Sequence, residues 1–187
     1  GWGVFDVAVP AYATQEGVQQ RVAWIFAAFG VATVIGGLLG GLVSKKLAPL
    51  SALRNAYLVW FITCIPIAFT YPDWTMALVG TFIGLMGGAV QVFYFEVLEA
   101  VRPQGSQTSS LGWIWSVEGS FMAVGAATGG WISEHYSPQF GLGLLPLMLL
   151  CGLLILTLGK KRLAAANDVP TEEEDLQAIK NISNEVK

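Results

Sequence analysis

The stretch that decides the fold is "TMALVGTFIGLMGGAVQVFYFEVLEAV", residues Thr75–Val101, in which apolar residues follow one another with few interruptions. It is longer than the roughly 17–25 residues that a helix needs to cross the hydrocarbon core of a bilayer. The apolar residues are continuous and do not alternate with polar ones, which argues against a strand. Only helices and closed barrels satisfy their backbone polar groups in lipid. The stretch therefore predicts a transmembrane helix.

The rest of the chain repeats this pattern. Four further apolar runs are separated by short connectors that contain Gly, Pro, Ser, Asn or Asp: Val22–Val43, Ala52–Phe69, Leu111–Ile132 and Phe140–Leu158. The composition agrees, because 54% of the 187 residues are hydrophobic and only 12% are charged, against about 25% charged in a soluble domain. The sequence predicts an all-α membrane protein, a polytopic helical bundle with five full spans.

The two ends of the chain differ from these runs. The opening "GWGVFDVAVPAYA" is apolar but too short to span a bilayer, and it lacks the basic start and cleavage site of a signal peptide. We expect a partial first helix, the last half of a span whose first half is missing, and hence a fragment. We expect the bundle to occupy residues 1–163. Residues 164–187 are expected to form a flexible acidic tail, in which "TEEED" also offers a capping box for a short helix.

The basic residues predict the orientation. One side of the predicted bundle holds a single basic residue, Arg21, and the other side holds seven: Lys45, Lys46, Arg54, Arg102, Lys160, Lys161 and Arg162. By the positive-inside rule the basic side is cytoplasmic. We therefore expect a multi-pass protein of the plasma membrane with a cytoplasmic C-terminus. Aromatic belts should then place Trp24, Trp74 and Trp131 near the outer interface, and Trp60, Trp113 and Trp115 towards the inner one.

Residues for enzyme chemistry are scarce. Cys64 and Cys151 lie in separate predicted spans without a CxxC spacing, and His135 is the only histidine. There is no P-loop, GxSxG or dinucleotide-binding fingerprint. We expect no catalytic residues, no metal site, no cofactor and no nucleic-acid partner.

Small residues mark three of the runs. Gly36 and Gly40 lie in "GGLLGG", and Gly84 and Gly88 share a helical face with Gln91. In the fourth run, small residues recur at alternating gaps of four and three: Gly112, Ser116, Gly119, Ala123, Ala126 and Gly130. Small residues let helix backbones approach closely in lipid. We predict tight packing at these positions, with Gly112, Ser116, Gly119 and Ala123 against another helix; a further possibility is that the helices tilt or slide along these seams.

Glu118 lies away from the stripe of small residues, about 120° round the helix. A charged group at the bilayer centre costs roughly 2.5–3.5 kcal/mol on insertion scales, and such a residue usually faces a cavity on a substrate or proton path. At similar depth on the preceding run lie Gln91 and Tyr94, and Asp6 is a second carboxylate on the partial first helix. Two readings stay open for Glu118: a position on such a path, or a structural hydrogen bond to a neighbouring helix.

Two local motifs carry a resemblance to a known family. The residues Gly40-Gly41-Leu42-Val43-Ser44-Lys45-Lys46 are similar to the G-x-L-x-D-R loop of the major facilitator superfamily, with Ser44 in place of the aspartate. The stretch "RPQGSQTSSLGWIWSVEGSFMAVGAATGGWISE" resembles the loop before helix eleven and helix eleven itself in bacterial drug or sugar efflux members. Together with the order of the runs, residues 1–160 resemble helices seven to twelve, the C-terminal six-helix half of such a transporter.

The resemblance implies a function. It implies alternating access around a midplane site, with Asp6, Gln91, Tyr94 and Glu118 on or near the path of substrate and protons. The favoured interpretation is an antiporter that couples proton entry to efflux of a small drug-like or sugar-like molecule, with the bilayer and the missing N-terminal half as partners. The alternatives are an uptake carrier of the same superfamily and a membrane scaffold or accessory subunit without transport of its own. Substrate, direction and coupling ion stay open.

Overall fold

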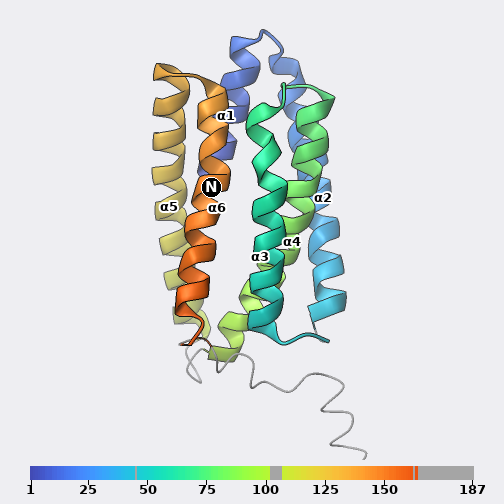
Figure 1. The fold of residues 1–187 in the computed structure, drawn as a ribbon, viewed down its shortest axis with the longest axis vertical. Helices are drawn as coiled ribbons and strands as arrows, with labels where there is room; N and C mark the ends of the chain where they lie inside the picture. The colour runs from blue at the N-terminus through green and yellow to red at the C-terminus, as the bar shows by residue number, and fades with distance from the viewer. Residues whose placement is uncertain (45, 102–106, 162, 164–187) are drawn as a thin grey trace, which may run out of the picture.

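The structure, a computed structural model of the chain, describes residues 1–44, 46–101, 107–161 and 163. In this part every element is helical, which confirms the predicted fold class. The α-helices are α1 (Trp2–Gln15), α2 (Val22–Ser44), α3 (Pro49–Cys64), α4 (Trp74–Val101), α5 (Gln107–His135) and α6 (Pro138–Gly159), with short 3₁₀ helices η1 (Gln19–Arg21) and η2 (Ile65–Phe69). The helices lie side by side along one long axis, and α1 begins about halfway along it (Figure 1).

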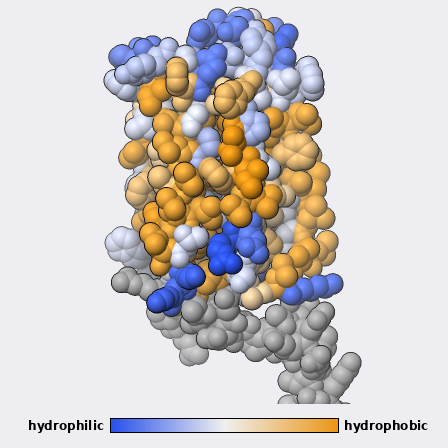
Figure 2. Space-filling view, in the orientation of Figure 1, coloured by the Kyte–Doolittle hydropathy of each residue, from blue (hydrophilic) through white to orange (hydrophobic). Residues whose placement is uncertain are grey.

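The two ends of the bundle differ in charge. Successive helices run in opposite directions, so α2, α4 and α6 end where α3 and α5 begin (Figure 1). This end, here called the basic end, holds the described residues Lys46, Arg54, Lys160 and Lys161. The opposite end holds Glu16, Arg21, Asp73 and Glu134. Hydrophilic residues gather at both ends and a broad hydrophobic band lies between them (Figure 2), as a multi-pass membrane protein requires.

Four of the described helical segments are long and apolar enough to cross a membrane: Gln19–Ser44, Pro49–Phe69, Trp74–Val101 and Pro138–Gly159. The sequence predicted five full spans. The helix that falls short is α5, which has sufficient length at 29 residues. Its hydropathy is lowered by Glu118 and by its many Gly, Ser and Trp residues. The prediction for α5 is therefore met in length and not in hydropathy.

Seven of the ten ends of the predicted runs are extended by one to four helical residues, and the other three coincide with the predicted bounds. At the start of α3, Pro49 takes a first-turn position, where its missing N–H is harmless. At the start of α6, the Ser137 side chain caps the helix by accepting a hydrogen bond from the Phe140 N–H at 3.4 Å. The run predicted as Ala52–Phe69 ends in the 3₁₀ helix η2, which contains Pro66 and lacks one backbone donor there.

The contact between α2 and α4 is built from glycines. An added Cβ at Gly36 would run into the carbonyl oxygen of Leu85, and one at Gly88 would run into the carbonyl oxygen of Thr33. At Gly84 the obstacle is the Phe29 carbonyl oxygen, and at Gly40 it is the Ala89 Cα, 2.9 Å away. The two backbones therefore approach more closely than any side chain would allow.

The stripe on α5 behaves differently, and here the prediction is wrong for the helices of this chain. An added Cβ at Gly112 or Gly119 would meet nothing within 4 Å, and Ser116 and Ala123 are exposed. The helix that packs on this part of the bundle is α1. Close contacts occur where α1 lies alongside: an added Cβ at Gly129 would be 3.1 Å from the Val4 Cα, and one at Gly130 would be 3.3 Å from the Val7 Cγ1.

Trp60 is not part of an interfacial belt, which corrects another expectation. It is 7% exposed, and its Nε1–H donates a hydrogen bond to the Ile83 carbonyl oxygen at 3.0 Å. A buried indole needs such a partner, and α4 supplies it. By contrast Trp113 is 73% exposed and Trp115 is 57% exposed.

Candidate functional site

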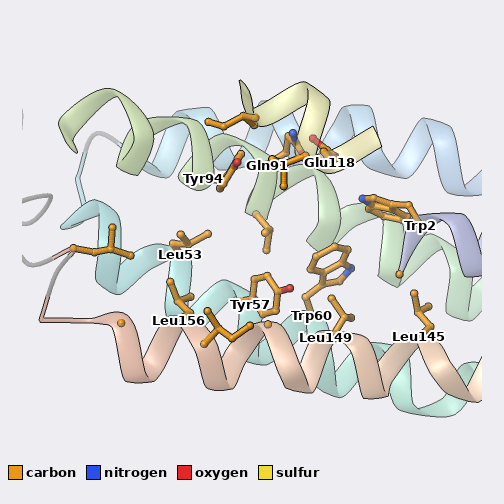
Figure 3. A pocket seen from close by; sticks show the side chains of 18 of the residues that line it. Trp2, Leu53, Tyr57, Trp60, Gln91, Tyr94, Glu118, Leu145, Leu149 and Leu156 are labelled. Atoms are coloured by element: carbon orange, nitrogen blue, oxygen red, sulfur yellow. The ribbon is translucent and has the colours of Figure 1, made fainter. Parts of the chain in front are cut away.

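A cavity of about 760 Å³ lies between α3, α4, α5 and α6, just beyond the start of α1 (Figure 3). Most of its wall is apolar, with leucines from α3 and α6 such as Leu53, Leu145 and Leu149. A concave, mainly apolar space with a few polar side chains is the usual form of a small-molecule site.

Three polar side chains that the sequence singled out line this one cavity. Gln91 and Tyr94, three residues apart on α4, share a helical face and lie across from Glu118 on α5 (Figure 3). All three are half-buried. The arrangement places one carboxylate beside a phenol and an amide, which can hydrogen-bond either to that carboxyl or to a bound molecule.

Asp6 does not join this group. It is exposed and is not among the residues that line the cavity. On α1 the inward face is occupied by Phe5, Ala8 and Val9, which are fully buried, and Asp6 lies one residue round the helix from that face. The structure therefore brings Gln91, Tyr94 and Glu118 together and leaves Asp6 outside this cavity, and the placement of Asp6 on or near the path stays a prediction.

Aromatic side chains form a second part of the wall. The ring centroids of Trp2 and Trp60 are 5.2 Å apart and those of Tyr57 and Trp60 are 5.5 Å apart. All three residues line the cavity, as does Trp113 from α5. Sequence reasoning missed these residues as site residues. Tyr57 and Trp60 stand three apart on one face of α3, and this spacing was the available signal.

The loop motif lies at the basic end, away from the cavity. Gly40 packs against Ala89, Leu42 is exposed, and Ser44 is buried with its hydroxyl donating to the Gly41 carbonyl oxygen at 3.2 Å. Lys45 lies outside the described residues. The hydroxyl that replaces the aspartate is thus bonded within its own helix turn.

A second cavity, about 610 Å³, lies between α4 and α5 nearer the basic end. Phe95 and Trp115 line it, with ring centroids 6.4 Å apart. Glu96 also lines it, and its Oε2 is buried without a hydrogen-bond partner among the described residues. The two cavities take their carboxylates from different helices.

A metal site is not formed by the described residues, in which no three His, Cys, Asp or Glu side chains come together. Both cysteines are free, Cys64 buried and Cys151 exposed. The titratable side chain that faces the larger cavity is Glu118, together with the phenols of Tyr57 and Tyr94.

A helical bundle with a hydrophobic band between polar ends (Figure 2) is typical of a polytopic membrane protein, and its cavity has the composition of a small-molecule site. The sequence model of the Major Facilitator Superfamily matches residues 1–185. The chain therefore belongs to this superfamily, whose members are membrane transporters that bind small molecules. Comparisons with curated proteins and with solved structures gave no significant match.

Proposed function

We propose that the chain is the C-terminal six-helix half of a bacterial efflux-type transporter, with residues 1–163 as its membrane bundle. The collection of Lys46, Arg54, Lys160 and Lys161 at one end supports a plasma-membrane orientation with that end in the cytoplasm. The tail, residues 164–187, follows α6 from the basic end and lies outside the described residues.

The transporter exchanges protons for a small drug-like or sugar-like molecule by alternating access. The observation that carries this proposal is that Gln91, Tyr94 and Glu118 line one cavity from two different helices. A carboxyl group in a low-dielectric site changes its affinity for a proton as water enters or leaves. Glu118 is therefore the proton carrier, and Gln91 and Tyr94 hold whichever species occupies the cavity. Asp6, exposed on α1, is not part of this step.

The α2–α4 contact supports a rigid unit within this cycle. Because Gly36 and Gly88 bring the two backbones together, α4 carries Gln91 and Tyr94 on a firmly held pair of helices. The opposite wall, with Glu118, belongs to α5, which packs on α1 and α6. The cavity thus lies between the α2–α4 pair, together with α3, on one side and α5 and α6 on the other.

Water access to the cavity is the first test. The full-length transporter, with Cys64 and Cys151 replaced by Ala, receives one new cysteine, either Ile114→Cys or Ile62→Cys. Ile114 lines the cavity, and Ile62 is exposed on the outer face of α3. We expect a membrane-impermeant methanethiosulfonate reagent to modify Ile114→Cys and to spare Ile62→Cys in proteoliposomes. If the reagent fails to modify Ile114→Cys from either side of the membrane, other protein fills the cavity. That result would contradict the proposed pathway.

Coupling is the second test. The full-length transporter is reconstituted in proteoliposomes that hold a pH gradient. Ethidium or maltose is added as the probe substrate, and a pH-sensitive dye reports proton movement. We expect one of these probes to dissipate the gradient with the wild type, Glu118→Gln to abolish this movement, and Glu96→Gln to retain it. Both variants keep the side-chain shape and remove one carboxylate, so equal melting temperatures check their folding. Wild-type proton movement with Glu118→Gln would rule out Glu118 as the carrier.

A further inference from the structure

We propose that the outer surface of α3 and α6 at the basic end binds an anionic phospholipid, whose phosphate lies between Arg54 of α3 and Lys160 and Lys161 of α6. This inference goes beyond the proposed transport and concerns a second kind of ligand, a lipid of the surrounding bilayer. It rests on the placement of the bundle in a membrane and does not depend on the proton carrier or on the transported molecule.

The two helices bring their basic residues to one level. Helices α3 and α6 pack on each other and lie side by side on the face seen in Figure 1. Near the basic end, Leu53 of α3 and Gly159 of α6 border the same cavity. Arg54 follows the first of these residues in the chain and Lys160 follows the second, and both basic residues are exposed. Their side chains therefore reach the surface at the same height along the bundle.

The positive charge of this surface is not offset by the helices that carry it. Helix α3 and the stretch from the start of α6 to Lys161 contain no Asp or Glu. The described carboxylates at the basic end, Glu96 and Glu99 of α4, border instead the cavity between α4 and α5. Basic groups between helices at the cytoplasmic side of a membrane attract anionic headgroups. The charge of this surface therefore fits an anionic lipid.

Exposed apolar residues continue from the basic residues along both helices. They follow at intervals of three or four, which keeps them on one helical face: Leu58, Ile62 and Ile65 after Arg54 on α3, and Leu158, Leu154, Cys151 and Leu147 before Lys161 on α6. Figure 2 shows this face, with hydrophobic residues above the hydrophilic ones at the basic end. A rise of about 1.5 Å per residue puts Ile65 about 16 Å from Arg54. That is about half of the roughly 30 Å hydrocarbon core, so the apolar face matches the acyl chains of one leaflet.

The chemistry of the headgroup decides which lipid fits best. The guanidinium group of Arg54 can donate two hydrogen bonds to a phosphate, and the ammonium groups of Lys160 and Lys161 add positive charge beside it. A zwitterionic lipid carries an ammonium group of its own, which these three cations repel. The surface thus favours a headgroup without a positive charge, such as that of phosphatidylglycerol. Bound there, the lipid links two helices that form part of the wall of the larger cavity.

The experiment measures lipid contact at one labelled position. In the full-length transporter, with Cys64 and Cys151 replaced by Ala, a bimane fluorophore is attached to Leu154→Cys on the exposed face of α6. Nanodiscs of phosphatidylcholine receive an equal small fraction of either phosphatidylglycerol or phosphatidylcholine with brominated chains, whose bromine atoms quench bimane on contact. We expect the association constant derived from quenching to be about tenfold or more higher for phosphatidylglycerol.

Variants assign this preference to the three cations. Replacing Arg54, Lys160 and Lys161 together by Gln should abolish the preference for phosphatidylglycerol. Arg54→Gln alone should reduce it about fivefold, while Arg54→Lys keeps most of it because the charge remains. The matched control is Arg21→Gln, which removes one positive charge at the opposite end of the bundle and should leave the preference unchanged.

Equal quenching by the two lipids, or an undiminished preference in the triple variant, would overturn the proposal. Absence of quenching by either lipid would overturn it as well, since other protein would then cover the surface. A preference that appears only after removal of residues 164–187 would assign the surface to the acidic tail instead. Melting temperatures identify a folding defect, and if the triple variant does not fold, Arg54→Gln against Arg54→Lys supplies the same comparison.

Discussion

Helices α4 and α5 both carry small residues at regular helical spacing, but the contacts that these residues make with other helices differ. On α4, Gly84 and Gly88 meet α2 so closely that a methyl group would run into backbone oxygens. On α5, Gly112 and Gly119 meet nothing within 4 Å. The difference lies in the partner, because α2 brings its own glycines, Gly36 among them, to the contact. A stripe of small residues permits close approach, and a second stripe opposite to it produces the contact.

The largest effect is expected from Gly88→Ala, with Gly119→Ala as its matched control. At Gly88 the new methyl group would run into the Thr33 carbonyl oxygen, and overpacking of this kind costs about 1–3 kcal/mol. At Gly119 there is open space, so the change should stay within about 0.5 kcal/mol. Thermal unfolding of the full-length protein in detergent measures both. A clear loss of stability in Gly119→Ala would show that the α5 stripe has a partner in the assembled protein.

A smaller effect is expected from Trp60→Phe, compared with Trp113→Phe. The first substitution removes the hydrogen bond from the Trp60 Nε1–H to the Ile83 carbonyl oxygen and should cost about 0.5–1.5 kcal/mol, the net contribution of one hydrogen bond. Trp113 is 73% exposed, so its replacement should change stability by less than about 0.5 kcal/mol. Denaturant titration in detergent would distinguish the two. Equal losses would mean that α5 is as closely packed as the α3–α4 side.

The two native cysteines offer a comparison without mutation. Cys64 on α3 is fully buried, and Cys151 on α6 is exposed. We expect membrane-permeant N-ethylmaleimide to modify Cys151 in the folded protein and to reach Cys64 only after unfolding, because access limits thiol reactions. Mass spectrometry of peptides from both states locates the label. Early modification of Cys64 would show that the helices around it open readily.

The smallest effect concerns the polar end opposite to the basic end, where Tyr71 follows η2 and its ring contacts Tyr12 of α1 with centroids 5.9 Å apart. A side-chain hydrogen bond with Glu16, then slight burial and the charge of Glu16, raise the pKa of Tyr71 above its ordinary value of 10.0. A group with a raised folded-state pKa contributes stability below about pH 10. This contribution is lost as the pH rises through the folded-state pKa. Phenolate absorbance of Tyr71, obtained by subtracting a Tyr71→Phe titration, should therefore appear at lower pH in Glu16→Gln. An unchanged titration would show that this link between α1 and the start of α4 does not form.

The helices could be predicted because continuous apolar runs of span length leave few alternatives. The orientation of individual side chains could not. Periodicity gives the angle between Glu118 and the α5 stripe about one helix axis, but not which neighbour lies at that angle. Trp60 shows the same limit, since an indole suits an interface as well as a core that offers it a carbonyl oxygen.

The candidate site was predictable in part for a related reason. Depth along straight helices can be counted from the basic end, and this placed Gln91, Tyr94 and Glu118 at one level. The aromatic wall needs residues from α1 and α3, which the sequence does not place beside α4. Asp6 lies outside the cavity because Phe5 and Val9 occupy the inward face of α1, which the sequence does not reveal.

The glycine contact between α2 and α4 has a consequence for the forces that hold helices together in lipid. Where a Cβ would strike the carbonyl oxygens of Leu85, Phe29 and Thr33, the glycines at these positions present a Cα–H instead. Such Cα–H···O contacts contribute about 0.5–1 kcal/mol each. Lipid removes the hydrophobic advantage of burying leucine between two helices, and these weak hydrogen bonds remain available there. The pair is thus held through its backbones, by an attraction that every larger residue at the same positions would remove.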